Sequence, residues 1–446
     1  MANRRTLTLT AASVTVVANM IGTGVFTTTG LMAAMGASSG DILWGWLIGG
    51  VIALCGALCY GEVGANLPHS GGEYYYLSRL LHPAVGFMSG AVSLVVGFAA
   101  PIAASAIALN LYVATVFPLW PVPVMAAATV LLLASFHALD LHLGSRFQTA
   151  ITFVKVALII TFIGGVFIAA PSATSELFRT QPKFLLSSPF AVVLVFVAFA
   201  YAGWNAAAYI GTELKHPERT LPRSLLIGTT LVTLLYLLLN LSYLLVVSTK
   251  ELSGVEQVGY LVATKLWGEG IAEVVSMLIA LTLLCPISAM LMVGPRIAEA
   301  MARDGFLPQS LGRLNRRHVP SRAVALQAIL AAIIAMSSSF GSLLIYIGFT
   351  LNIFAGLTVI SLFRLRRENR AHVKVCIGYP VTPLVFLAFT LWMTVWSIRE
   401  EPRATLAGVA TLVIGFVLYL LRARRARLVE ETVETSVEVS VNAGNS

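Results

Sequence analysis

The chain is poor in charged residues. Asp, Glu, Lys and Arg make up 11% of its 446 residues, whereas a soluble domain carries roughly 25%. This scarcity excludes an ordinary soluble enzyme or binding domain. Hydrophobic residues reach 58% and the mean hydropathy is +0.86, so the composition predicts an integral membrane protein whose first partner is the lipid bilayer.

Cysteine and histidine are also scarce, with four and seven residues. Cys55 and Cys59 lie one helical turn apart in an apolar run, Cys285 lies in another run, and Cys376 lies in a basic loop. No spacing resembles a metal site or a disulfide framework. The scattered histidines do not form the convergent titratable set that catalysis needs. The sequence therefore predicts no metal, no cofactor and no enzymatic activity.

Long apolar runs, in contrast, fill most of the chain. A membrane-spanning helix needs about 20 mostly apolar residues, and these runs do not alternate in polarity as the strands of a membrane barrel do. We expect an all-α membrane protein, with a disordered polar tail over residues 425–446. The twelve predicted transmembrane helices cover residues 8–33, 41–66, 84–117, 121–139, 145–170, 189–214, 221–248, 270–300, 321–339, 341–364, 379–398 and 403–423.

The net charge of +9 could suggest a nucleic-acid partner, but the positions of the basic residues argue against it. They lie mainly in the short segments between runs. With the N-terminus inside, 21 of the 29 Lys and Arg residues fall in inner segments and six in outer segments. Because basic residues accumulate on the cytoplasmic side, we expect a multi-pass protein of the cytoplasmic membrane with both termini inside.

The first run contains a stretch, Asn19–Gly30, that weakens a helix near the middle of the bilayer. Gly22 and Gly24 flank Thr23 there, and each Gly costs about 1 kcal/mol relative to Ala in a helix interior. Unwound backbone is tolerated in a membrane only beside protein or a water-filled cavity. The stretch is therefore a candidate binding site, although a single Gly-x-Gly also fits close helix packing.

A second weak point lies in the sixth run, where small residues alternate with aromatics over Phe199–Asn205. Each weak point falls in the first helix of a five-helix set, a pattern that indicates a transporter built from inverted repeats. The repeats are expected over residues 1–170 and 189–364, followed by two C-terminal helices within 379–423. Half-helix N-termini suit a carboxylate and half-helix carbonyls suit an ammonium, so the paired breaks predict a site for a zwitterionic amino acid.

Four segments resemble signatures of the amino acid–polyamine–organocation transporter superfamily, and most closely those of bacterial relatives of the L-type amino acid transporters. They follow in the same order as in that family. The resemblance implies a twelve-helix fold with a five-plus-five inverted repeat, broken helices one and six, alternating access and amino acid substrates. The segments are Ile21–Phe26, Glu62–Pro68 with Ser70–Tyr76, Phe199–Asn205 with Glu213–Pro217 and Leu221–Arg223, and Ala302–Pro308.

The resemblance also implies a substrate site at the two breaks. The family's carboxylate site falls on Thr23 and Gly24, and Phe199 matches its aromatic lid. Thr23 replaces the more usual Ser, Ala202 replaces a common Gly, and the family's Pro after the first break is absent from Thr27–Gly30. The residues expected to line the site are Met20, Ile21, Gly22, Thr23, Gly24, Phe199, Ala200, Ala202, Gly203, Trp204 and Asn205.

Lys155 is a charged residue inside the fifth run. Such a residue is costly in a membrane and usually functional. The resemblance implies that a Lys at this position of helix five occupies the space of the sodium site found in sodium-coupled relatives. We therefore expect a sodium-independent carrier in which Lys155 faces helices one and eight and takes part in coupling. The alternative is a side chain that extends to the inner surface, but Arg146 is 9 residues away, roughly 14 Å along a helix.

Glu62 and Glu213 lie near the cytoplasmic ends of their helices. We expect them to form inner-gate or structural ion pairs rather than to touch substrate. The two stretches at the breaks contain no Asp, Glu, Lys or Arg. Because an unpaired buried charge is expensive, the sequence predicts a neutral amino acid as substrate, moved by exchange or with protons.

Other functions fit the sequence less well. A carrier of polyamines or other organic amines is the alternative within transporters, and the missing carboxylate at the breaks counts against it. An ion channel needs a continuous polar pore lining, which no run supplies. A nutrient sensor is a further alternative, but no signalling domain accompanies the helices.

Animal L-type transporters carry a Cys between helices three and four that links them to a heavy subunit. The corresponding loop here, Phe117–Pro123, contains none. We therefore expect no disulfide-linked heavy subunit and a carrier that works alone in a bacterial inner membrane.

Overall fold

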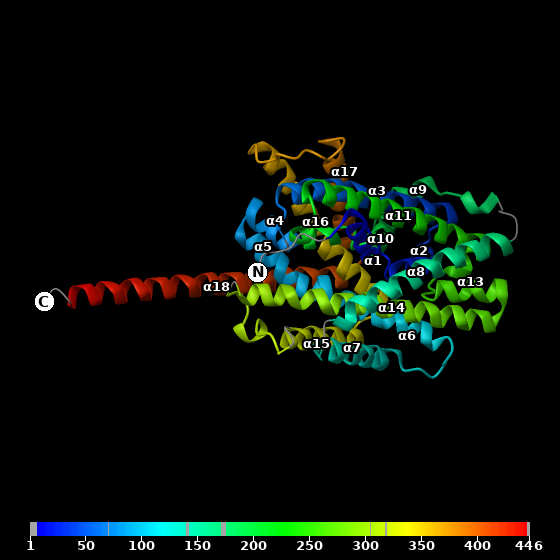
Figure 1. The fold of residues 1–446 in the computed structure, drawn as a ribbon. Helices are drawn as coiled ribbons and strands as arrows, with labels where there is room; N and C mark the ends of the chain where they lie inside the picture. The colour runs from blue at the N-terminus through cyan, green and yellow to red at the C-terminus, as the bar shows by residue number, and fades with distance from the viewer. Residues whose placement is uncertain are drawn as a thin grey trace.

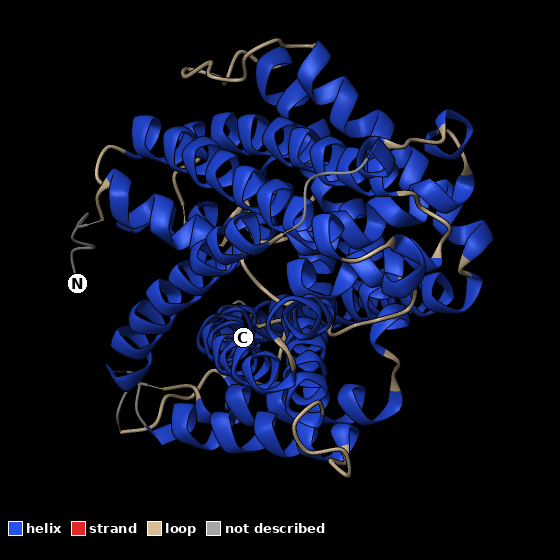
Figure 2. Cartoon of the chain, turned by 90° about the vertical axis from the view of Figure 1, so that its right-hand side faces the viewer, coloured by secondary structure: helices blue, strands red, loops and turns tan. Residues whose placement is uncertain are grey.

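The computed structural model describes residues 7–69, 71–139, 142–170, 175–303, 305–316 and 319–443, with the backbone alone for 139, 142–150, 175–176, 300, 303 and 423–443. Helices and loops make up this described part of the chain (Figures 1 and 2), apart from one isolated bridge between Leu7 and Leu214. The all-α prediction is confirmed.

The long helices agree with the predicted runs. Nine helical segments in the described chain are long and apolar enough to span a membrane, and one further pair, α1 and α2, forms a span bent by 41°. The helices of this set are α1 (Leu9–Met20), α2 (Gly24–Ala34), α3 (Ser39–Asn66), α5 (Pro83–Val92), η1 (Ser93–Ala99), α6 (Ala100–Ala114), α8 (His142–Ala169), α10 (Ser188–Tyr201), η3 (Ala206–Glu213), α11 (Pro217–Val246), α14 (Glu269–Arg303), α16 (Phe340–Arg367), α17 (Val381–Glu400) and α18 (Pro402–Ala443).

Two shorter apolar helices occupy the predicted fourth and ninth runs. They are α7 (Val122–Leu139) and α15 (Ser321–Ser337), which pack against each other. Since their apolar parts are shorter than a typical span, the count of twelve stays a prediction. The remaining short helices are α4 (Gly72–Leu80), η2 (Ser175–Phe178), α9 (Pro182–Leu185), α12 (Thr249–Leu252), α13 (Val258–Trp267) and η4 (Gln309–Leu311).

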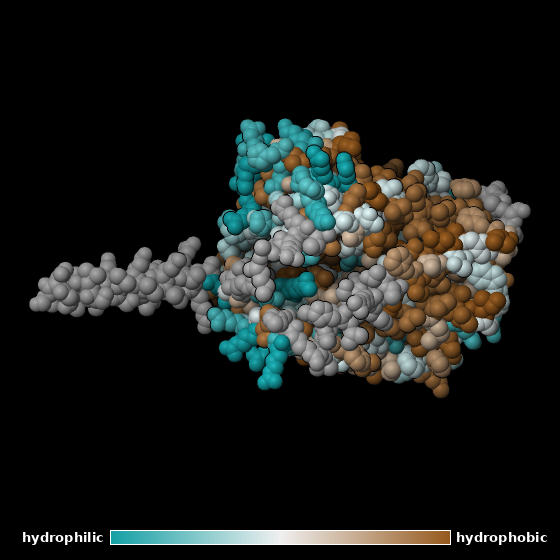
Figure 3. Space-filling model, viewed as in Figure 1, coloured by the Kyte–Doolittle hydropathy of each residue, from teal (hydrophilic) through white to brown (hydrophobic). Residues whose placement is uncertain are grey.

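The surface has the polarity of a membrane protein. Hydrophilic residues gather at the end from which α18 leaves the body, and hydrophobic residues cover most of the remaining face (Figure 3). Large apolar side chains are exposed on several helices, among them Leu132, Phe153, Leu234, Ile333 and Leu421. Water would make such exposure unfavourable, so these side chains face lipid.

Both predicted breaks are confirmed. The first lies between α1 and α2, at Ile21–Thr23, where Gly22 and Gly24 weaken the helix. The second follows Tyr201, where α10 ends and the chain turns before η3. Gly203 has φ +98° in this turn, a conformation that L side chains rarely adopt. Glycine is therefore required for this path of the chain.

The structure differs from the sequence prediction in the third run. The third helix contains a seven-residue π-helical segment, η1, that separates α5 from α6. The described backbone of α18 runs to Ala443 without an intervening Gly or Pro beyond residue 425, and the disordered tail stays a prediction. Residues 444–446 of that tail, and residues 1–6 of the predicted first repeat, lie outside the described residues.

Candidate functional site

The two breaks open onto one cavity of about 240 Å³. Helices α4, η1, α6, α14 and α16 complete its wall. Of the eleven residues predicted for the site, ten line this cavity, and Ile21 lies behind it, fully buried. The ten are Met20, Gly22, Thr23, Gly24, Phe199, Ala200, Ala202, Gly203, Trp204 and Asn205.

The two broken helices meet at two close contacts that only glycine permits. A β-carbon on Gly24 would lie 2.4 Å from the Cα and Cβ atoms of Ala200. A β-carbon on Gly203 would lie 2.8 Å from the backbone carbon and oxygen of Asn19. Each break therefore holds a glycine against the other broken helix, so the two breaks form a single unit.

Free backbone groups are available at the first break. Helix α2 begins at Gly24, and the hydroxyl of its N-cap residue, Thr23, makes no capping hydrogen bond. The first N–H groups of a helix have no partner within it, and the positive end of the helix dipole favours an anion. This end of α2 borders the cavity through Gly22, Thr23 and Gly24, so its wall there suits a carboxylate.

Some carbonyl groups at the breaks are already engaged. The Phe199 carbonyl accepts the N–H of Ala202 at 2.9 Å. The hydroxyl of Tyr236, on α11, lies 2.7 Å from the carbonyl oxygen of Met20 and 3.2 Å from that of Ala200. Tyr236 is completely buried and bridges the two broken helices. Nothing local distinguishes a tyrosine in an apolar run, so the sequence does not predict this role.

Replacing Tyr236 by Phe is expected to weaken substrate binding about 2- to 10-fold, which corresponds to the loss of one neutral hydrogen bond. The ring and its packing against Trp46 are kept, so folding should be preserved while the two breaks lose their common donor. The measurement is the KM of amino acid uptake in proteoliposomes.

Tyr346→Phe is the matched control, since that hydroxyl lies 2.9 Å from the Thr411 hydroxyl and outside the cavity. An equal KM in the Tyr236 variant and the wild type would show that this bridge does not position the substrate site.

Lys155 reaches helix one from α8. Its ammonium donates to the carbonyl of Ala18 at 3.2 Å and to the carbonyl of Ile21. The side chain is 0% exposed, so it does not extend to the inner surface. One turn earlier on α8, the Thr152 hydroxyl lies 3.7 Å from the Cys285 thiol of α14. The ammonium thus holds the unwound end of α1, beside α14.

Glu62 and Glu213 lie away from the cavity. Both carboxylate oxygens of Glu62 accept from Arg366, at 2.6 and 2.7 Å. Its Oε2 also accepts the backbone N–H groups of Val375 and Cys376 at 2.9 and 2.8 Å. Glu213 contributes its carbonyl, which accepts the N–H of Leu7 at 3.0 Å, and its carboxylate forms no ion pair among the described residues.

Glu73 is an acidic residue of the cavity wall that the sequence patterns at the two breaks do not predict. The breaks themselves contain no acidic residue, but α4 brings this carboxylate to the cavity wall. Its Oε1 accepts from the Tyr60 hydroxyl at 2.6 Å and from the Asn205 amide at 3.2 Å. Burial raises the pKa of Glu73 to about 7, against the lowering effect of these two hydrogen bonds. The only local signal was its place in the Ser70–Tyr76 segment.

Sequence comparisons place these features in a known family. The sequence model of the amino acid permease family matches residues 5–421. The large neutral amino acids transporter small subunit 2 of Rattus norvegicus is 30% identical over 438 residues, which cover 94% of this chain and 80% of the relative. The b(0,+)-type amino acid transporter 1 of Mus musculus is 28% identical, covering 91% and 85%. The Asc-type amino acid transporter 1 of Mus musculus is also 28% identical, covering 94% and 81%.

Proposed function

The chain belongs to the amino acid permease family, and on this premise we propose that it carries neutral L-amino acids across the cytoplasmic membrane by alternating access. In this proposal transport is independent of sodium and proceeds by exchange or by proton coupling. Amino acid transport itself follows from family membership. The substrate class, the coupling and the roles of single residues are the proposal.

The observation that carries the proposal is the meeting of two broken helices at one cavity. The N-terminal end of α2 borders it on one side, and the last turn of α10 borders it on the other. A carboxylate suits the first end and an ammonium suits the second. An amino acid carries both groups.

A neutral side chain fits the charges of the cavity. Neither Lys nor Arg lines it in the described chain, and its one acidic residue, Glu73, is already hydrogen-bonded to Tyr60 and Asn205. The name of the rat relative also specifies large neutral amino acids. Glu73 is the observation that favours the alternative, a carrier of polyamines or other organic amines, since a carboxylate attracts a second ammonium group.

Uptake into proteoliposomes discriminates between these two functions. Leucine, alanine and serine are expected to be taken up and to exchange with internal substrate at an equal rate with and without sodium. Arginine, glutamate and putrescine are not expected to compete. Competition by putrescine or arginine, with none by leucine, alanine or serine, would establish the alternative instead.

Lys155 is proposed to replace a coupling sodium ion. Its ammonium is buried against the carbonyls of Ala18 and Ile21, and backbone carbonyls of an unwound helix are typical sodium ligands in transporters of this architecture. A fixed positive charge there satisfies these carbonyls without an ion. It thereby supports transport that does not depend on sodium.

Lys155→Ala is expected to lower uptake at least tenfold, since hydrogen bonds to a charged group contribute about 1.5–3 kcal/mol. The carbonyl groups at the unwound end of α1 would lose their hydrogen-bond donor, and the substrate site would lose its shape. Uptake is measured at matched expression, with a panel of neutral amino acids. Lys265→Ala is the control, because Lys265 is 40% exposed in its ion pair with Glu251. Wild-type rates and substrate dependence in Lys155→Ala would overturn this role.

The five-plus-five inverted repeat is likewise proposed, and helix packing supports it. In such a repeat, helices two, three and four correspond to helices seven, eight and nine. In each of these three cases the corresponding helices pack against each other, as α3 with α11, α6 with α14, and α7 with α15. Glu62, through Arg366, and Glu213, through Leu7, are proposed to stabilise the inner end of this assembly.

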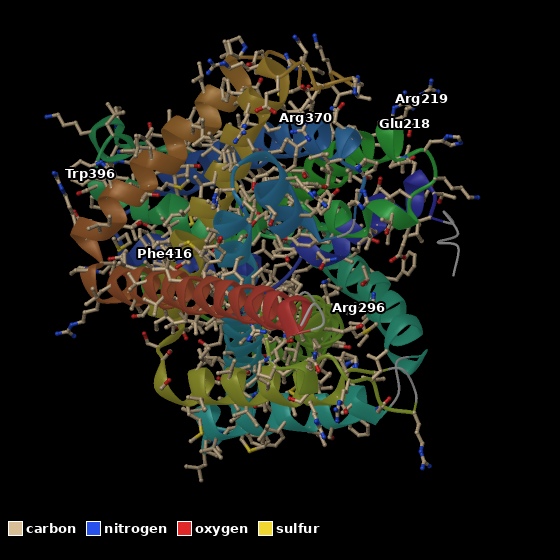
Figure 4. The ribbon with its side chains drawn as sticks, turned by 90° about the vertical axis from the view of Figure 1, so that its left-hand side faces the viewer. Glu218, Arg219, Arg296, Arg370, Trp396 and Phe416 are labelled. Carbon is tan, nitrogen blue, oxygen red and sulfur yellow. The ribbon has the colours of Figure 1, made fainter. Side chains whose placement is uncertain are left out.

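Both termini are proposed to lie in the cytoplasm. Figure 4 looks onto the end of the molecule from which α18 leaves, with Arg219 and Arg370 at its rim and Arg296 nearer its middle. The last turn of α16 adds Arg364, Arg366 and Arg367. Basic residues accumulate on the cytoplasmic side of a membrane, which supports this orientation.

A chain without a disulfide-linked heavy subunit is also proposed, although the name of the rat relative calls that protein a small subunit. The four cysteines support the proposal by their positions. Cys59, Cys285 and Cys376 are buried, Cys55 is half-buried within α3, and the loop over 117–123 has none. Non-reducing electrophoresis of the native membrane protein, expected to give a single monomer band, tests it.

A further inference from the structure

Glu73 is a buried carboxylate in the wall of the proposed substrate cavity. It stands in the first turn of α4 and its side chain is 6% exposed. Its two hydrogen-bond donors come from opposite sides, Tyr60 from α3 and Asn205 from the second break. Asn205 is the N-cap residue of η3. The charge on Glu73 therefore acts directly on the broken helix.

No cation balances this carboxylate among the described residues. Helix α4 packs against α3, α5, α16 and η3. Two positive groups of α16 have other partners, since Arg366 pairs with Glu62 and Arg364 pairs with Glu368. The described salt bridges include none with Glu73. The titratable groups on the elements around it are Asp41, Cys55, Cys59, Tyr60 and Glu62 on α3, Tyr209 and Glu213 in η3, Tyr346, Arg364, Arg366 and Arg367 on α16, and Tyr74, Tyr75, Tyr76 and Arg79 on α4 itself, with none on α5.

Filling the cavity changes the environment of Glu73. An ionised carboxylate is stabilised by water, and an apolar group that displaces this water favours the protonated form. A neutral amino acid that enters the cavity therefore raises the proton affinity of Glu73. By linkage, a proton on Glu73 raises the affinity for that amino acid by the same factor.

We propose that Glu73 is the proton-binding residue of this carrier, so that one proton moves with each neutral amino acid. The proton comes from the outer solution, binds a carboxylate oxygen as substrate occupies the cavity, and leaves to the inner solution with the substrate. No other bond is made or broken, and each cycle moves one positive charge inward. The inference rests on the proposed amino acid transport and adds its coupling ion and the residue that binds it.

Two further observations support this role. The pKa of Glu73, raised by burial to about 7, lies within the range in which a modest change of surroundings alters protonation. The amide of Asn205 donates to this carboxylate, and such a hydrogen bond is stronger to the ionised form than to the protonated form. Protonation thus weakens one contact between α4 and the second break, which links the proton to the broken helix.

Proton uptake on substrate binding tests the proposal. The purified full chain is titrated with L-alanine, L-serine and L-leucine near pH 7, in two buffers of different ionisation enthalpy, by calorimetry. The wild type is expected to take up between zero and one proton per bound amino acid, with affinity that rises as pH falls. Glu73→Gln is expected to bind without proton uptake and with affinity independent of pH. Glu256→Gln is the control, because Glu256 is a half-buried carboxylate outside the cavity, and it should retain the uptake.

Tyr60→Phe supplies a second test that does not depend on how Glu73→Gln folds. The Tyr60 hydroxyl stabilises the ionised carboxylate, so its loss should move the midpoint of proton uptake to higher pH by about one unit. Three results would each overturn the coupling and leave the proposed amino acid transport standing. They are substrate binding by the wild type without proton uptake, proton uptake retained in Glu73→Gln, and an unchanged midpoint of proton uptake in Tyr60→Phe. Absence of binding by any of the three amino acids would overturn both.

Discussion

Gly203→Ala is expected to reduce amino acid uptake at least 100-fold, or to prevent folding. Two costs coincide at this residue. Its φ of +98° is strained for any residue with a β-carbon. That β-carbon would also lie 2.8 Å from the backbone carbon and oxygen of Asn19. A backbone atom cannot turn aside as a flexible side chain can, so the two broken helices would have to separate.

The same reasoning applies to Gly24→Ala, where the new β-carbon would meet the Cα and Cβ atoms of Ala200 at 2.4 Å. Uptake at matched expression and elution from a size-exclusion column distinguish inactive protein from unfolded protein. Gly164→Ala is the matched control, since that glycine lies in α8 with nothing within 4 Å of the added carbon, and it should behave as wild type. Near-normal uptake in both Gly203→Ala and Gly24→Ala would show that close contact between the breaks is not required.

Glu62→Ala should lower the free energy of unfolding by about 3–5 kcal/mol, the usual cost of breaking a buried ion pair. Glu62 is 0% exposed. Its removal leaves the Arg366 guanidinium, and the N–H groups of Val375 and Cys376, without their acceptor. The inner ends of α3 and α16 would lose their common attachment to the loop that follows α16.

Thermal unfolding in detergent, followed by the fraction that remains monodisperse, measures this effect. Glu368→Gln is the control, because that carboxylate is 35% exposed and pairs with exposed Arg364 and Arg370. Exposed ion pairs add little stability because solvent screens them, so its transition should barely move. If the two variants lost equal stability, the buried pair would have no special structural role.

Local sequence information was sufficient for the helices and for their breaks. A helix that must satisfy its own backbone in a bilayer has a length and polarity that can be read directly, so the long runs agree with the observed helices. A glycine changes the conformational freedom of the backbone at its own position. The helix interruptions near Gly22 and Gly203 are therefore predictable from the sequence.

The partners of the site residues could not be predicted in the same way. Tyr236, Glu73 and Lys155 come from three different helices and act on backbone or side chains far away in the sequence. Lys155 is predictable from the sequence because a charge inside an apolar run is conspicuous. Glu73 is not predictable in this way, because it follows a polar loop, where a carboxylate is ordinary until the fold buries it.

The sequence by itself determined an all-α membrane protein, the two helix breaks and the expectation of an amino acid site, because bilayer burial and glycine conformation are properties of short segments. Only the tertiary structure decided which groups surround that site. The packing of α3 and α4 against η3 and of α11 against α1, together with the reach of Lys155 from α8, brings these donors and charges to the breaks. These contacts join residues far apart in the sequence, 216 positions in the case of Tyr236 and Met20, which no local pattern encodes.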